Sequence, residues 1–165
     1  MKKYLYIAMM VVALLPLASC SENEPMEYAG QPSLYFDNED INYSFFYSED
    51  GGDRSSVDIT VHAMGPVSDH DRTFTLYQKN VDETDAAQAG VHYVGFDTDV
   101  MKQAMVIPAG KSEVKLPIVL LKDNSLATQT VKLKIGVRPN ENFGAGVVEK
   151  DSTVISFSSQ AIKPA

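Results

Sequence analysis

The chain has 165 residues, and its 22 acidic residues outnumber its 14 basic residues to give a net charge of −8. This length fits one domain that can bury a core. The negative charge excludes partners that need a positive protein surface, namely nucleic acids and anionic membrane surfaces. Because the chain has a single cysteine, no internal disulfide is available and the fold must be stabilised by its core.

The first 19 residues have the pattern of a bacterial export signal. Lys2 and Lys3 supply positive charge, and residues 4–17 are almost continuously apolar. This apolar run is shorter than the roughly 20 residues that a membrane-spanning helix needs. We therefore predict that residues 1–19 are a cleavable signal peptide.

The signal peptide is expected to end at a lipidation site. Leu17, Ala18 and Ser19 precede Cys20, and this ending resembles the bacterial lipobox, in which the cysteine thiol receives a diacylglycerol. A free thiol at Cys20, or an ordinary secretion signal that ends in cysteine, is the alternative. The lipobox interpretation predicts a membrane partner, reached through a lipid anchor on Cys20.

Residues 20–33 are expected to form a tether between the lipid and the folded domain. They are polar and contain two prolines and a glycine, which is typical of a flexible linker. Glu22 and Glu24 resemble the acidic surface-export signal of Bacteroidetes lipoproteins. Without residues 1–19, 12 basic residues remain against 22 acidic ones, a net charge of −10. We expect an outer-membrane lipoprotein displayed at the cell surface, or otherwise at the periplasmic face.

From residue 34 onward, hydrophobic residues recur at every second position, the period of a strand with one buried face. Turn-forming residues separate the segments. The expected strands are 34–37, 41–48, 57–63, 72–79, 103–107, 114–121, 131–137 and 153–158. Residues 81–88 are the one plausible helical turn. The pattern predicts an all-β fold, an Ig-like antiparallel β-sandwich of about seven to nine strands over residues 34–160, with a tail at 161–165.

The aromatic residues of segment 41–48 are expected to lie on two faces of one strand. Tyr43, Phe45 and Tyr47 would share a face, with Phe46 on the other. We interpret the three as core or near-core residues. A platform that binds a ligand is the alternative interpretation.

The order of several motifs resembles Calx-beta-like domains. A Gly90-Val91-His92-Tyr93 loop precedes a Pro108-Ala109-Gly110 turn, an amphipathic strand that ends near Asp123, and a further strand at 131–137. With the lipobox, the chain resembles uncharacterised Bacteroidetes lipoproteins that have this sandwich and are often encoded near starch-utilisation-like uptake systems. The resemblance implies a role in glycan capture or uptake.

The calcium site of some Calx-beta domains is incomplete in this sequence. Those sites need a cluster of acids after the strand, but Ser125, Thr128 and Gln129 occupy the region that follows Asp123. Calcium prefers six to eight oxygen ligands, several of them anionic. We therefore expect no cofactor and no metal site, with Asp123 as a weak candidate for calcium.

A candidate binding loop lies between the predicted strands at 72–79 and 103–107. It contains His92, Tyr93, Asp97 and Asp99, whose side chains combine an imidazole, an aromatic ring and two carboxylates. Asp and Gly are also ordinary turn residues. In that alternative, Tyr93 packs its ring on the sandwich and bonds its hydroxyl to a loop carbonyl.

The sequence contains no recognisable catalytic motif. The three histidines lack metal-ligand spacing, and no Gly-x-Ser-x-Gly elbow or phosphate-binding loop occurs. We predict a non-catalytic binding or accessory module that takes a polysaccharide. The alternative is a structural or adhesion module that docks on an outer-membrane protein complex. Glycan binding predicts exposed aromatic residues, whereas docking predicts an apolar patch or an unprotected edge strand.

Overall fold

The computed structural model describes residues 28–37, 40–48, 52–146 and 149–161. Nine strands lie in these ranges: β1 (Ser33–Phe36), β2 (Ile41–Ser44), β3 (Arg54–Met64), β4 (Arg72–Thr73), β5 (Thr75–Gln78), β6 (Val106–Ile107), β7 (Glu113–Leu121), β8 (Val131–Arg138) and β9 (Ser152–Ser158). Three short helices accompany them: η1 (Phe45–Tyr47), α2 (Asp99–Ala104) and η2 (Asn124–Ala127). The predictions for residues 1–27, among them the lipobox at Leu17, Ala18, Ser19 and Cys20, lie outside the described residues.

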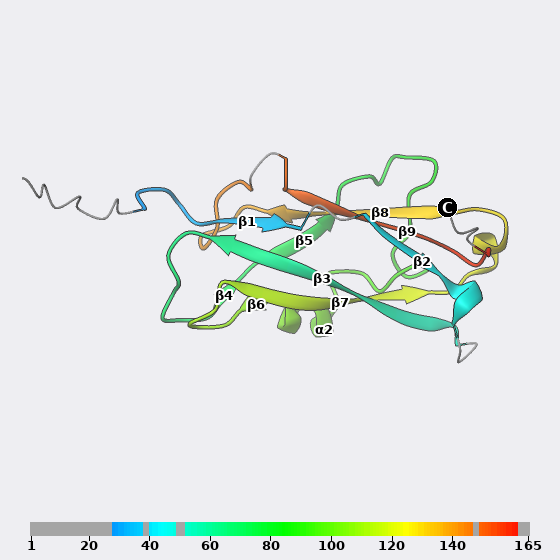
Figure 1. Ribbon diagram of the computed structural model, residues 1–165, viewed down its shortest axis with the longest axis horizontal. Helices are drawn as coiled ribbons and strands as arrows, with labels where there is room; N and C mark the ends of the chain where they lie inside the picture. The colour runs from blue at the N-terminus through cyan, green and yellow to red at the C-terminus, as the bar shows by residue number, and fades with distance from the viewer. Residues whose placement is uncertain (1–27, 38–39, 49–51, 147–148, 162–165) are drawn as a thin grey trace, which may run out of the picture.

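Two larger sheets run along the long axis of the molecule (Figure 1). Sheet A has the strand order β1-β3-β7, sheet B has the order β2-β9-β8-β5, and β4 pairs with β6 in a small third sheet. The prediction of an all-β sandwich with seven to nine strands is therefore confirmed. No helix in the described part of the chain is long and apolar enough to cross a membrane.

Alternating side chains of the two larger sheets form one core. On β7, Leu116, Ile118 and Leu120 are buried, while the residues between them are exposed or half-buried. The same alternation buries Leu133 and Ile135 on β8. Each such side chain contributes roughly 1.5–3 kcal/mol relative to an exposed one. With no disulfide available, this core is what stabilises the domain.

Every pair of named strands is antiparallel except β2 and β9, which run parallel. In this pair Ile41 lies opposite Ile155. Strand β9 therefore lies between β2 and β8, with an early strand on one side and a late strand on the other. Period-two alternation does not report strand direction, so the sequence could not predict this exception.

Segment 41–48 does not form one strand. Strand β2 ends at Ser44, whose Oγ accepts a hydrogen bond from the Phe46 backbone N–H at 3.2 Å and starts η1. As a result Phe45 is buried, while Phe46 and Tyr47 are 61% and 58% exposed. The prediction that Tyr43, Phe45 and Tyr47 share one face was wrong, because a short helix replaces the end of the strand.

Three other boundaries also differ from the predicted ones. Segment 72–79 divides into β4 and β5, with Phe74 between them donating its N–H to the Met105 carbonyl at 3.1 Å. Segment 103–107 begins as the last turn of α2, and only Val106–Ile107 is a strand. Residues 81–88 form turns rather than a helix. A six-residue helix is too short to establish a 3.6-residue period in the sequence, and α2 was missed for that reason.

Candidate functional site

A groove of about 680 Å³ lies beside strand β5 and is called here the β5 groove. Its lining includes the buried residues Phe74, Leu76, Tyr93, Phe96 and Met105. The more exposed lining residues are Thr73, Thr75, Tyr77, Ala89, Gly95, Asp97, Lys102 and Arg138. Ligand sites in proteins have this composition, a largely apolar surface with a few convergent polar groups.

Strand β5 forms one side of the groove because it is an edge strand of sheet B. Its partner β8 lies on one side only, and on the other side the backbone meets Met105, the residue that follows α2. Phe74 donates its N–H to the Met105 carbonyl, but Leu76 donates to the Met105 Sδ at 3.2 Å. A thioether is a weak acceptor, so the pairing of β5 on this side is incomplete.

Tyr77 and Arg138 form a stacked pair at the groove. The Arg138 guanidinium carbon lies 4.7 Å from the centroid of the Tyr77 ring. Tyr77 lies opposite Gly136 in the sheet, where a Cβ would come within 3.1 Å of Tyr77 Cε1 and 2.7 Å of Lys79 Cδ. The missing side chain at Gly136 therefore gives Tyr77 and Lys79 room to lie across β8. A guanidinium over a tyrosine face is attracted by the ring quadrupole.

Tyr93 contributes its ring, not its hydroxyl, to the groove. The side chain is buried, and its hydroxyl donates a hydrogen bond to Gln78 Oε1 at 2.9 Å. Burial, together with the charge of Asp97, raises the pKa of Tyr93, so the hydroxyl stays protonated and keeps donating. The ring packs on the sandwich as the sequence suggested. Its hydrogen-bond acceptor is a side-chain amide on β5 and not a loop carbonyl.

His92 lies outside the groove and has a structural role. Its Nδ1 accepts the Gln88 backbone N–H at 3.0 Å, so the proton of the neutral ring is on Nε2, which lies 3.0 Å from Ser125 Oγ. Burial lowers the pKa of His92, and the carboxylate of Asp123 opposes this only in part. A buried neutral imidazole with both nitrogens bonded fixes the loop and is closed to a ligand.

The three acidic candidates have different positions. Asp97 is exposed and lines the groove, whereas Asp99 is exposed at the start of α2 and is not among the lining residues. Asp123 caps η2, where its Oδ1 accepts the Ser125 N–H at 2.9 Å. Hydrogen bonding from the Ser125 side chain, and secondarily from the Ser125 backbone, lowers the pKa of its carboxyl. The described residues contain no group of three or more His, Cys, Asp or Glu side chains that could hold a metal.

The groove therefore brings together two of the four predicted loop residues, Tyr93 and Asp97, with three that the sequence did not single out. These are Tyr77, Lys102 and Arg138. For Tyr77 and Arg138, the sequence offered only their positions, which alternate with those of core residues on the same strands. Lys102 lies on the helix that was not predicted. The pairing of β5 with β8, which joins these residues, is not readable from period-two alternation.

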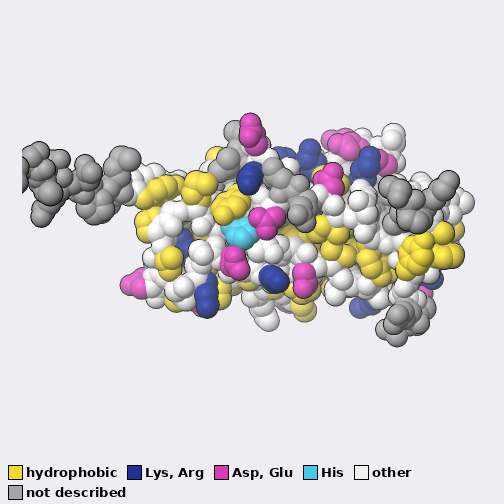
Figure 2. Space-filling view, viewed as in Figure 1, with side chains coloured by type: hydrophobic (Ala, Val, Ile, Leu, Met, Phe, Trp, Pro, Cys, Tyr) yellow, Lys and Arg dark blue, Asp and Glu magenta, His cyan; other side chains and the backbone are white. Residues whose placement is uncertain are grey.

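A second polar cluster lies on the outer face of sheet A, the face seen in Figure 2, where a histidine is surrounded by acidic side chains. His62 Nε2 lies 3.1 Å from Asp37 Oδ2, and His62 Nδ1 lies 3.2 Å from Glu113 Oε2. The His62 ring stacks on Tyr35 with a centroid distance of 4.9 Å. The aromatic face and both ring nitrogens of His62 are thus occupied by groups of the chain itself.

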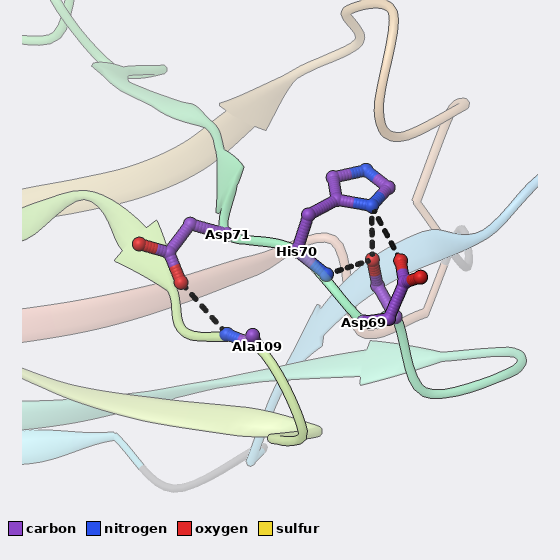
Figure 3. Close-up of polar contacts among 5 residues, drawn as sticks. Asp69, His70, Asp71 and Ala109 are labelled. Atoms are coloured by element: carbon purple, nitrogen blue, oxygen red, sulfur yellow. Dashed lines mark hydrogen bonds and ion pairs between the residues drawn. The ribbon is translucent and has the colours of Figure 1, made fainter.

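A third cluster is the turn that leads into β4 (Figure 3). The Ser68 hydroxyl and Asp69 carboxylate approach His70 Nδ1 at 3.0 and 2.9 Å, and Asp71 accepts the Ala109 N–H at 2.8 Å. The His70 contact lowers the pKa of Asp69. These exposed groups bond to one another and hold the turn against the segment after β6, so we interpret the cluster as structural.

Beneath this turn lies a buried cation. Arg72 is only 5% exposed, and its guanidinium carbon lies 5.0 Å from the centroid of the Phe143 ring. Its Nη2 donates to the Lys111 carbonyl at 3.4 Å, and its Nε has no hydrogen-bond partner among the described residues. Because that Nε is also closed to solvent, a ligand in the pocket that Arg72 helps to line could not reach it.

Comparison with known proteins identifies the family and the fold. The model of the family described as "Domain of unknown function (DUF4843)" matches residues 24–165. No curated protein matches the sequence. A crystal structure of a "putative carbohydrate binding protein" from Bacteroides ovatus is similar, with a TM-score of 0.50 and 19% sequence identity over 76% of this chain. The chain spans 36% of the length of that protein, and at this identity the likeness shows the fold alone.

Proposed function

We propose that this chain, which belongs to the DUF4843 family, is a non-catalytic carbohydrate-binding module of the cell envelope. The observation that carries the proposal is the β5 groove, where the half-buried ring of Tyr77 lies among exposed polar groups above an apolar floor that includes Tyr93 and Phe96. A sugar ring presents C–H groups that pack on aromatic faces and hydroxyls that bond to polar side chains. The groove offers both kinds of contact.

The fold supports this proposal without deciding it. The structurally similar protein from Bacteroides ovatus is described as carbohydrate binding. That description belongs to the other protein, which is much longer than this chain. What transfers is the sandwich, a scaffold on which loops and edge strands carry recognition.

The groove lacks the groups that sugar hydrolysis needs. Glycosidases generally place two carboxyl groups on either side of the scissile bond. Asp97 is the one carboxylate in the lining. Tyr93, the other candidate acid, has its hydroxyl committed to Gln78. Binding without turnover is therefore the proposed activity.

The proposed location follows from residues 1–33, not from the fold. Lipid on Cys20 would anchor the chain in the outer membrane, and the acidic residues Glu22 and Glu24 favour display at the cell surface over the periplasmic face. The membership in the Calx-beta-like lipoprotein family is part of the same proposal. Labelling of intact cells with an antibody, and incorporation of labelled fatty acid that disappears in Cys20→Ser, would test it.

The binding proposal is tested with the chain lacking residues 1–19, because all named strands lie between Ser33 and Ser158. We expect at least one polysaccharide of a dietary and host panel to bind in calorimetry. Tyr77→Ala should weaken that binding by roughly tenfold, the effect of removing an aromatic contact of about 1.4 kcal/mol. Tyr35→Ala on the outer face of sheet A is the matched control. A folded protein that binds no glycan contradicts the proposal.

One observation favours a second function, docking of a protein partner by strand addition. On the side of β5 away from β8, the Leu76 N–H meets only the thioether of Met105, which a partner strand would have to displace. An incompletely paired edge strand can accept a strand from another chain. In this case an outer-membrane extract would slow hydrogen exchange at Leu76, and no glycan would. Unchanged exchange in that extract would remove this alternative.

A further inference from the structure

We propose that the ligand of the β5 groove is an acidic polysaccharide, one that carries carboxylate or sulfate groups. This inference rests on the proposed carbohydrate-binding function and names the class of glycan. It starts from the charges at the groove, which are opposite in sign to those of the chain as a whole.

The lining contains two cations and one acid. Lys102 and Arg138 are both exposed, and Asp97 is the single carboxylate. The lining therefore has a net charge of +1 on a chain whose net charge is −8. A local positive site on an acidic protein excludes neither neutral nor acidic sugars by itself. It does attract an anion, which the acidic parts of the surface repel.

Neither cation of the groove has an acidic partner among the described residues. Salt bridges elsewhere pair Lys79 with Asp151 at 2.7 Å and Lys132 with Asp85 at 2.8 Å. No carboxylate among the described residues pairs with Lys102 or Arg138. The N–H groups of two cations that line the same groove therefore remain available to an external anion.

Arg138 is held in a geometry suited to an acid group. Its guanidinium carbon lies 4.7 Å from the centroid of the Tyr77 ring, and this contact restrains the side chain at the groove. A planar guanidinium binds a carboxylate or a sulfate through two parallel hydrogen bonds. Because the stack already restricts the long side chain, less conformational entropy is lost when the ligand binds.

The positive charge continues along the outer face of sheet B. Lys132, Lys134 and Arg138 occupy alternate positions of β8 together with Gly136, so they point to the same face, where the charge of Lys132 is already balanced by Asp85 at 2.8 Å. Lys134 also has no acidic partner among the described residues. At ~3.3 Å per residue, Lys134 and Arg138 are roughly 13 Å apart along the strand. A polymer with repeated acid groups could contact both, whereas a single acidic sugar could contact only one.

The test compares each acidic polymer with its neutral ester. The chain lacking residues 1–19 is titrated with polygalacturonate, alginate and hyaluronan, and with the esterified form of each, at low and at high salt. We expect at least one acidic polymer to bind about tenfold more tightly than its ester, and salt to weaken that binding.

Variants then assign the preference to the groove. Lys102→Gln combined with Arg138→Gln should lower the affinity for the acidic polymer about tenfold more than it lowers the affinity for the ester, so that the preference for the acid is lost. Lys115→Gln combined with Lys122→Gln, two exposed cations outside the lining, is the matched control and should change neither. Circular dichroism confirms that each variant is folded.

The outcomes separate the two proposals. Equal binding of a polymer and its ester, or binding of neutral glycans only, overturns the acidic-ligand inference and keeps the carbohydrate-binding function. An acid preference that the double variant retains also overturns the inference, because the cations responsible would lie elsewhere. Binding of no polymer, acidic or neutral, overturns both proposals.

Discussion

The two sheets each carry an aromatic ring stacked with a nitrogen-rich side chain on their outer face, but the two pairs are completed differently. On sheet A, His62 stacks on Tyr35, and its ring nitrogens contact Asp37 and Glu113. On sheet B, Arg138 stacks on Tyr77 and has no carboxylate partner among the described residues. In the first pair, the ring nitrogens of His62 have their partners within the chain. In the second pair, the N–H donors of Arg138 face solvent.

The difference shows how an aromatic pair that stabilises the fold can be distinguished from one that binds a ligand. Aromatic contact alone does not distinguish them, since both rings lie on exposed sheet faces. What differs is whether the polar group already has its partners, because a ligand competes only for donors that are open. If this comparison is right, giving Arg138 a partner should close the binding site, and removing the partner of Tyr35 should affect stability alone.

The largest expected effect comes from giving Arg138 an internal acid. Thr75 lies directly opposite Arg138 in the sheet, so Thr75→Asp would place a carboxylate beside the guanidinium. We expect about a tenfold loss of affinity for the acidic polymer, with thermal stability unchanged. Thr75→Asn, which has nearly the same shape without the charge, is the control. Equal losses in both variants would show that shape at Thr75, and not the charge, controls binding.

The next effect concerns stability on sheet A. His62→Ala removes the stack on Tyr35 and leaves the carboxylates of Asp37 and Glu113 without their shared partner. We expect a loss of roughly 1 kcal/mol in the free energy of unfolding, measured with urea. Arg138→Ala should change that free energy by no more than about 0.5 kcal/mol. If Arg138→Ala is the more destabilising change, the stack on sheet B is structural after all.

Arg72 makes another cation–aromatic contact, and this one is buried. Its charge has no carboxylate partner among the described residues, and a buried charge without a partner is costly. We expect Arg72→Met to keep the packing on Phe143 and to raise the free energy of unfolding by up to about 1 kcal/mol. Arg72→Lys, which keeps the charge and loses the planar group, should lower it. A marked loss of stability in Arg72→Met would mean that the contact with Phe143 outweighs the cost of burying the charge.

The smallest effect is the pH dependence that His92 introduces. Its pKa in the folded protein lies below the ordinary value of 6.5, so below that pH the unfolded chain takes up a proton that the folded chain does not. Stability from the neutral ring is therefore present above pH 6.5 and is lost as the pH falls toward the depressed pKa. His92→Gln should make the urea midpoint of unfolding less dependent on pH between roughly pH 7 and pH 5. Asp123 titrates below its ordinary 3.8 and does not enter this window.

The sequence predicted the scaffold better than the site, for a physical reason. Alternation at 57–63, 114–121 and 131–137 records which side chains face the core, and all three strands were found there. It also set Arg138 on the opposite face, whereas Tyr77 was not singled out. That these two residues meet, and that Lys102 approaches them, depends on the pairing of β5 with β8 and on a helix too short to leave a period. His92 was assigned to the candidate binding loop from its local motif, which does not reveal the hydrogen bond of its Nε2 with Ser125, 33 residues away.

The parallel pairing of β2 with β9 constrains the order in which the domain can fold. Ile41 finds its partner in Ile155, 114 residues later. Until β9 has been synthesised, β2 has no neighbouring strand in sheet B, and β8 lacks one of its two neighbouring strands. A growing chain therefore cannot assemble this sheet stepwise from its N-terminal side, and an incomplete chain exposes unpaired strand edges that invite aggregation. Contacts of such long range also make folding slow. Sheet B is thus completed only when β9 is inserted between β2 and β8.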